Sequence, residues 1–173
     1  DRWFRAAFEA SNVCMGLLEP DGRVAEVNET LARYTREHND QVVIIPTAYA
    51  DPLAAGLPPR DPAAIPVLVW IGNLGNAHYV RQVLPALEEV ARSRAFRLRL
   101  IGGADIGDVR SPTVDIEHVP WTEAREHELL ATADVGLMPL SATDYDEGKC
   151  AFKIIQYYSA GLPVVASPVG MNQ

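Results

Sequence analysis

The strongest constraint on the fold is the regular alternation of short apolar runs with longer amphipathic segments after residue 66. The runs have the length of strands, whereas the segments between them repeat apolar residues at helical spacing. Strands that alternate with helices indicate a Rossmann-like α/β domain, in which a parallel sheet carries helices on both faces. The predicted strands are residues 67–71, 97–101, 114–119, 135–140 and 162–166.

Three helices are expected between these strands. Residues 79–92 carry apolar side chains at helical spacing. Thr122 and Glu123 favour a second helix start, because threonine can cap a helix and an acidic residue suits its first turn. The third predicted helix covers residues 148–160 and ends at Gly161.

The first 39 residues follow a different pattern. An amphipathic segment at residues 1–10 precedes apolar runs at residues 13–18 and 24–27, and the Pro-Asp-Gly sequence between the runs favours a tight turn. This order resembles the opening of a PAS sensor domain, whose landmarks match Phe4, Phe8, Asp21, Gly22 and Asn28. We therefore expect an incomplete α+β PAS-like or leading segment at residues 1–39.

A second interpretation joins the end of this segment to the sheet. Residues 28–39 and 41–47 fit a helix followed by a buried strand, which is also how a parallel α/β layer begins. Residues 48–66 contain five prolines, which lack a backbone donor, and therefore predict a loop or linker. We expect the α/β domain to cover residues 40–173 and to lack its last helices.

Composition and charge exclude several classes of protein. The net charge of −8 argues against a nucleic-acid surface, which needs a basic patch. No apolar run approaches the roughly 20 residues that span a bilayer, and no signal peptide is expected. Cys14 and Cys150 are interpreted as reduced thiols. These features predict a cytoplasmic protein, and they leave open a peripheral association with the inner face of the membrane.

Candidate ligand-binding residues follow the predicted strands, because ligands of open parallel sheets bind beyond the carboxyl ends of the strands. Gly72 and Asn73 follow the first strand, Gly103 follows the second, and Trp121 follows the third. Glycine permits close approach of the backbone to a ligand, and an indole can stack on a base or sugar. The alternative is that each glycine only ends a strand. The absence of a GxGxxG motif disfavours a nicotinamide oxidoreductase.

Lys149 and Lys153 are the only lysines in the chain. Their spacing places them on one face of the predicted helix at residues 148–160. Because helix N-termini and ammonium groups both attract anions, the pair indicates a phosphorylated ligand. The alternative is that both lysines simply lie on a solvated helix face.

No catalytic constellation is evident in the sequence. The histidines are scattered, no HExxH motif or cysteine pair predicts a metal site, and no serine has the GxSxG setting of a hydrolase. The catalytic residues therefore stay unassigned, and neither a metal nor another cofactor is expected.

Residues 133–140, 148–153 and 161–170, with Gln156 and Tyr157, resemble the donor-binding C-terminal half of a family 4 glycosyltransferase with the GT-B fold. The resemblance implies that the domain binds a nucleotide diphosphate sugar as substrate and transfers the glycosyl group with retention of configuration, without an obligatory metal. The nucleotide-sugar-binding residues that we expect are Gly72, Asn73, Gly103, Trp121, Glu147, Lys149, Lys153 and Gln156.

The resemblance also implies individual roles. Lys149 and Lys153 would contact the diphosphate, Gly72 and Asn73 would approach the phosphates, and Trp121 would lie in the base-binding loop.

The sequence departs from the family pattern at several positions. Many members carry two glutamates separated by seven residues, the second of which contacts the ribose; the matching positions here are Gly148 and Gln156. Gln156 can still bond a hydroxyl, whereas Glu147 can replace the first glutamate only if the loop shifts by one residue. The basic pair that many members place after the first strand is also absent, unless Arg81 takes its place.

The acceptor-binding half of a GT-B enzyme is not found in this sequence, so we expect a donor-domain fragment. The acceptor stays unassigned, with a saccharide and a lipid carrier as the open choices. The alternative function is that of a PAS-linked sensing or interaction protein with a non-catalytic α/β domain.

Overall fold

A computed structural model describes residues 64–172 except residues 104, 105 and 107, together with residues 16–18, 24–27 and Arg36. The chain divides into two compact units. One contains Tyr49–Leu140 and Lys153–Ser167, and the other contains Asp1–Ala48, Ser141–Phe152 and Pro168–Gln173. The predictions for residues 1–10, for residues 41–47, for nearly all of the helix at 28–39 and for most of the linker at 48–66 lie outside the described residues.

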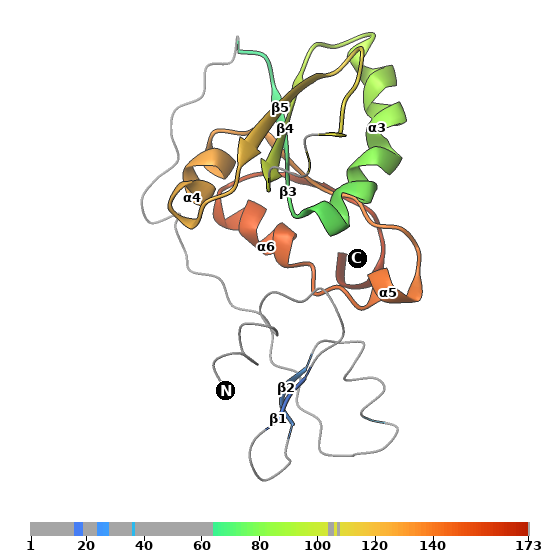
Figure 1. The fold of residues 1–173 in the computed structure, drawn as a ribbon, viewed down its shortest axis with the longest axis vertical. Coiled ribbons are helices and arrows are strands. Elements are labelled where there is room, and N and C mark those ends of the chain that lie inside the picture. Colours follow the sequence, from blue (N-terminus) through green and yellow to red (C-terminus); the bar gives the residue numbers. More distant parts are fainter. Residues whose placement is uncertain are drawn as a thin grey trace. The chain divides into compact units, whose positions relative to one another are not determined.

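A parallel sheet of five strands forms the centre of the first of these units (Figure 1). Its order is β5-β4-β3-β6-β7. The chain therefore adds β4 and β5 on one side of β3, and then β6 and β7 on the other side of β3. The predicted Rossmann-like α/β class is confirmed, and each predicted strand is present with ends that differ slightly. The strands are β3 (Val67–Ile71), β4 (Arg97–Gly102), β5 (Asp115–Pro120), β6 (Val135–Met138) and β7 (Val164–Ala166).

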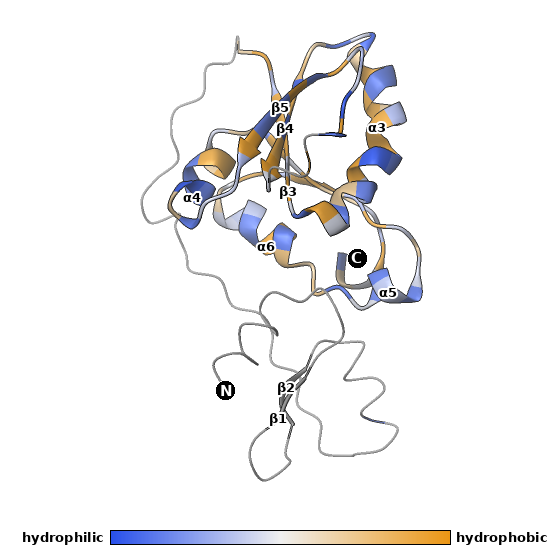
Figure 2. Cartoon of the chain, viewed as in Figure 1, coloured by the Kyte–Doolittle hydropathy of each residue, from blue (hydrophilic) through white to orange (hydrophobic). Residues whose placement is uncertain are grey.

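One face of the sheet is covered by α3 (Ala77–Ala91). Trp70 and Leu100 of the strands form a buried cluster with Ala77 and Val80 of this helix. Figure 2 shows alternating polar and apolar turns along α3. The predicted amphipathic helix at residues 79–92 is therefore confirmed, with a start two residues earlier.

The opposite face is covered by α6 (Phe152–Ser159). Successive strand side chains point to opposite faces, and Leu137 belongs to the cluster under α3, so its neighbour Gly136 faces the other way. A Cβ atom at Gly136 would lie 2.5 Å from the ring of Tyr157, which shows how closely α6 packs there.

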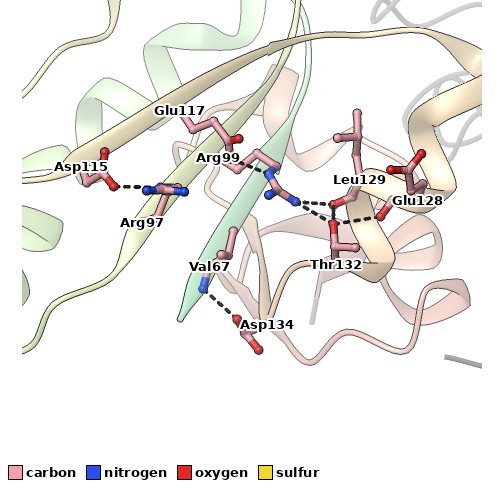
Figure 3. A network of polar contacts seen from close by, with 9 residues as sticks. All are labelled: Val67, Arg97, Arg99, Asp115, Glu117, Glu128, Leu129, Thr132 and Asp134. Carbon is pink, nitrogen blue, oxygen red and sulfur yellow. Dashed lines mark hydrogen bonds and ion pairs between the residues drawn. The ribbon is translucent and has the colours of Figure 1, made fainter. Parts of the chain in front are cut away.

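A polar network at the amino-terminal edge of the sheet fixes α4 (Glu123–Ala131) (Figure 3). The guanidinium of Arg99 donates to the Glu117 carboxylate at 2.7 Å. It also donates to the Leu129 carbonyl and to the Thr132 hydroxyl, both at 2.9 Å. The end of α4 is thereby tied to the middle of β4.

The start of α4 agrees with the sequence prediction. Thr122 occupies the N-cap position with extended backbone, although its side chain makes no capping hydrogen bond, and Glu123 and Glu126 lie in the first turn.

None of the helices in the described part of the chain is both long and apolar enough to cross a membrane.

The predicted helix at residues 148–160 is wrong at its beginning. A short helix, α5 (Asp144–Glu147), ends at Gly148, and Ala151 adopts a positive φ of 52° before α6 starts at Phe152. The side chain of Thr143 stabilises the separate α5 turn by accepting from the Asp146 N–H. Lys149 therefore lies outside any helix, and the two lysines do not share a helix face.

Two described strands lie in the N-terminal part of the chain. β1 (Gly16–Leu18) and β2 (Val24–Val27) pair antiparallel, with Gly16 opposite Val27. Strands within the predicted runs at residues 13–18 and 24–27 are thus confirmed. The PAS-like interpretation stays a prediction, because its landmark residues lie outside the described residues.

Replacement of Tyr157 by phenylalanine is expected to destabilise the α/β domain. The Tyr157 hydroxyl accepts from the Ile71 N–H at 3.2 Å and donates to the Leu137 carbonyl at 3.0 Å. Its loss leaves two buried backbone groups unpaired, so Tyr157→Phe should cost about 1–3 kcal/mol in the free energy of unfolding, measured with urea. Tyr158, which is 60% exposed, provides the control; Tyr158→Phe should change stability by less than about 0.5 kcal/mol. Equal effects would contradict this role.

Candidate functional site

Glycines lie where the carboxyl ends of β3 and β4 pack closely together. The Gly72 N–H donates to the Ile101 carbonyl at 2.9 Å, and the Trp121 N–H donates to the Gly102 carbonyl at 2.8 Å. A Cβ atom at Gly102 would lie 2.3 Å from the Gly72 carbonyl oxygen. Close packing of strand ends thus explains Gly102 structurally, and it places Gly72 beside the exposed Gly103 on this edge.

Asn73 caps the turn that follows β3. Its Oδ1 accepts from the backbone N–H of Asn76 at 3.2 Å and from the side-chain amide of Asn76 at 3.1 Å. The capped turn is a 3₁₀ helix, η2 (Leu74–Asn76), which leads directly into α3. Asn73 is exposed at the same edge as Gly72, so a structural role and a ligand-binding role are compatible there.

Glu126 connects two of the predicted site residues. The indole Nε1 of Trp121 donates to Oε2 of Glu126 at 2.6 Å, and the side-chain amide of Gln156 donates to Oε1 at 2.8 Å. The ring of Trp121 remains 49% exposed, whereas Gln156 is buried. The structure therefore brings Trp121 and Gln156 into one cluster beyond the end of β5.

Sequence reasoning missed Glu126. The helix dipole by itself explains an acidic residue in the first turn of a helix, so the pattern does not single out Glu126. The available signal was its position five residues after Trp121, but nothing in the pattern indicates the contact with Gln156, thirty residues further along the chain.

Lys149 forms an ion pair inside its own loop. Its ammonium lies 3.6 Å from the carboxylate of Asp146, which is 2% exposed, and 5.1 Å from the centre of the Tyr145 ring. The other oxygen of Asp146 accepts from the Thr143 hydroxyl at 2.9 Å and from the Ser141 N–H at 3.2 Å. Lys149 thus compensates a buried carboxylate, a structural role that the sequence did not indicate.

Two opposite influences act on the pKa of Lys149. Burial lowers the pKa of the Lys149 ammonium below its ordinary value, and the charge and hydrogen bond of Asp146 act in the opposite direction. Glu147 is the exposed last residue of α5. Gly170 approaches its backbone, since a Cβ atom at Gly170 would lie 2.4 Å from the Glu147 carbonyl oxygen.

The remaining candidate cations have separate positions. Lys153 is the second residue of α6 and is half-buried, one turn before Gln156. Arg81 of α3 pairs with both carboxylate oxygens of Asp108 at 2.6 Å. This pairing favours a structural role for Arg81 over replacement of the missing basic pair. Within the described residues, no group of three or more His, Cys, Asp or Glu side chains is arranged to hold a metal ion.

Comparison with protein-family models relates the chain to a known family. Residues 65–173 match the model of the family described as glycosyl transferases group 1. This range contains the whole parallel sheet, α3, α4, α6 and the cluster around Glu126. A search of proteins with curated functions finds no match.

Replacement of Asp146 by asparagine is expected to lower the pKa of Lys149 further. The amide keeps an oxygen that can accept from Thr143 but removes the negative charge that favours the ammonium. Because the chain has two lysines, ¹³C-labelled lysine gives two resonances, and a pH titration by NMR measures both pKa values. The Lys153 resonance is the control and should titrate as in the wild type. An unchanged Lys149 titration would contradict the pairing.

Proposed function

Because the chain belongs to the glycosyl transferases group 1 family, we propose that its α/β domain binds the nucleotide diphosphate sugar from which a glycosyl group is transferred. Membership in the family assigns glycosyl transfer in general, with a sugar donor and an acceptor. The nucleotide donor, retention of configuration and the independence from metal are part of the proposal. The acceptor hydroxyl, on a saccharide or a lipid carrier, receives the glycosyl group.

The observation that supports this proposal best is the cluster of Trp121, Glu126 and Gln156. It lies beyond the carboxyl end of β5, on the edge where open parallel sheets bind ligands. An exposed indole suits a base, and an amide suits the hydroxyl groups of a ribose. The chain therefore offers both kinds of contact that a nucleoside requires.

The proposed chemistry of the remaining residues is electrostatic. Cleavage of the glycosyl bond leaves negative charge on the nucleotide diphosphate, and preorganised donors stabilise such charge. Lys149 and Lys153 are proposed as the cations for the diphosphate, and the backbone at Gly72, Asn73 and Gly103 as its close neighbours. Glu147 is proposed as an acceptor for the sugar. In a chain with a net charge of −8, such a site depends on local cations.

A nucleoside diphosphate is expected to stabilise the folded chain. Titration with UDP, GDP and ADP, followed by thermal unfolding, should identify one that raises Tm by roughly 5–10 °C at one hundred times its Kd, because it binds only the folded state. The corresponding nucleosides are the controls and should give smaller shifts. If none of the three diphosphates shifts Tm, the donor proposal is wrong, and a PAS-linked sensing or interaction protein becomes the better account.

Removal of the Lys149 ammonium is expected to weaken diphosphate binding. Lys149→Ala should raise Kd about tenfold or more, since a charge-assisted hydrogen bond contributes roughly 1.5–3 kcal/mol and each ~1.4 kcal/mol is one decade. Calorimetric titration of the folded protein measures the change. Arg94, an exposed cation in the turn before β4, supplies the control, and Arg94→Ala should leave Kd unchanged. Equal Kd values for wild type and Lys149→Ala would show that Lys149 serves only Asp146.

A further inference from the structure

Glu126 accepts hydrogen bonds from two elements that are distant in sequence. Trp121 belongs to the connection after β5, and Gln156 belongs to α6, while Glu126 itself lies in the first turn of α4. Each donor uses a different oxygen of the carboxylate, at 2.6 and 2.8 Å. One side chain therefore sets the position of two others relative to each other.

The carboxylate also determines how the Gln156 amide is oriented. An ionised carboxylate can only accept hydrogen bonds, so the amide nitrogen must face Glu126 and the carbonyl oxygen must face away from it. Within the described residues, Oε1 of Gln156 accepts no hydrogen bond, so this acceptor remains for a ligand hydroxyl or for water. The bond to Glu126 thus converts an ambiguous amide into a directed acceptor.

The same carboxylate holds the ring of Trp121. Its indole N–H has a partner in Glu126, yet the ring is 49% exposed at the edge of the sheet. An exposed tryptophan with one end fixed presents a flat apolar face with little loss of rotamer freedom on binding. Base–aromatic stacking of this kind contributes about 1–3 kcal/mol per base.

We propose that Glu126 is the positioning residue of a ribonucleoside subsite. It holds the Trp121 ring where a base can stack and holds Oε1 of Gln156 where a ribose hydroxyl can donate to it. This inference rests on the proposed binding of a nucleotide diphosphate sugar and deepens it, because it adds selection for ribose over deoxyribose. Glu126 itself touches neither base nor sugar.

A polarity swap tests this role. Glu126→Gln keeps the size of the side chain but presents one oxygen and one NH2 group. With the oxygen accepting from Trp121, Gln156 keeps a bond to position 126 only by turning Oε1 toward the NH2 group, so this acceptor no longer faces the ligand. Adding Gln156→Glu restores both bonds with reversed polarity: the amide at position 126 accepts from Trp121 and donates to the carboxylate at position 156. That carboxylate keeps a second oxygen for the ribose, and the net charge of the chain returns to its original value.

The measurement is calorimetric titration of the full chain with the best-binding of UDP, GDP and ADP and with its 2′- and 3′-deoxy forms. Glu126→Gln should weaken binding of the ribonucleotide about tenfold, the effect of one hydrogen bond, and should abolish the preference over the deoxy forms. The double variant should return to within about threefold of the wild type and regain that preference. Glu128→Gln, on the exposed face of the same helix, is the control for charge and should have no effect.

Each outcome decides between the alternatives. If the wild type binds none of the three nucleotides, the proposed function and this inference both fail. If the wild type binds and Glu126→Gln keeps the same Kd and the same deoxy preference, Glu126 only ties α4 to α6, and this inference alone fails. If the single variant does not fold, the double variant decides, because loss of its ribose preference overturns the inference and retention supports it.

Discussion

The hydroxyl of Tyr157 is the contact on which the rest of the α/β domain depends. It bonds both β3 and β6 at the position where the strand order reverses, and Gly136 leaves room for the ring beneath α6. Burial raises the pKa of Tyr157 far above its ordinary value, so the group remains a protonated donor at neutral pH. Since α6 also carries Gln156 and Lys153, this contact positions the helix to which two candidate site residues belong.

The two edges of the sheet use charge in different ways. At the amino-terminal edge, arginines of β4 pair with acids of β5, and Arg99 also binds the end of α4. At the carboxyl edge, closely packed glycines join the strand ends, and Glu126 binds neutral donors. Ion pairs therefore stabilise one edge, whereas the other keeps an exposed ring and an amide oxygen available. This difference supports our proposal that the sugar donor binds at the carboxyl ends of the strands.

Sequence patterns predicted the elements better than the site. Short apolar runs located all five strands of the sheet, because helices cover both of its faces. Apolar residues at helical spacing located α3, because only one face of that helix is buried. The predicted start of the last helix was wrong, because residue spacing cannot reveal the positive φ of Ala151 or the cap that Thr143 provides to α5. Glu126 was missed because its value depends on a partner thirty residues away.

The sequence by itself determined the α/β class, the order of strands and helices, and the family likeness of residues 133–170, because local period and short motifs carry that information. The tertiary structure alone decided which polar groups meet. It paired Lys149 with the buried Asp146, where spacing had placed it beside Lys153 on a helix, and it joined Trp121 to Gln156 through Glu126. Hydrogen bonds and ion pairs act over a few ångströms in space, and only the folded chain establishes those distances.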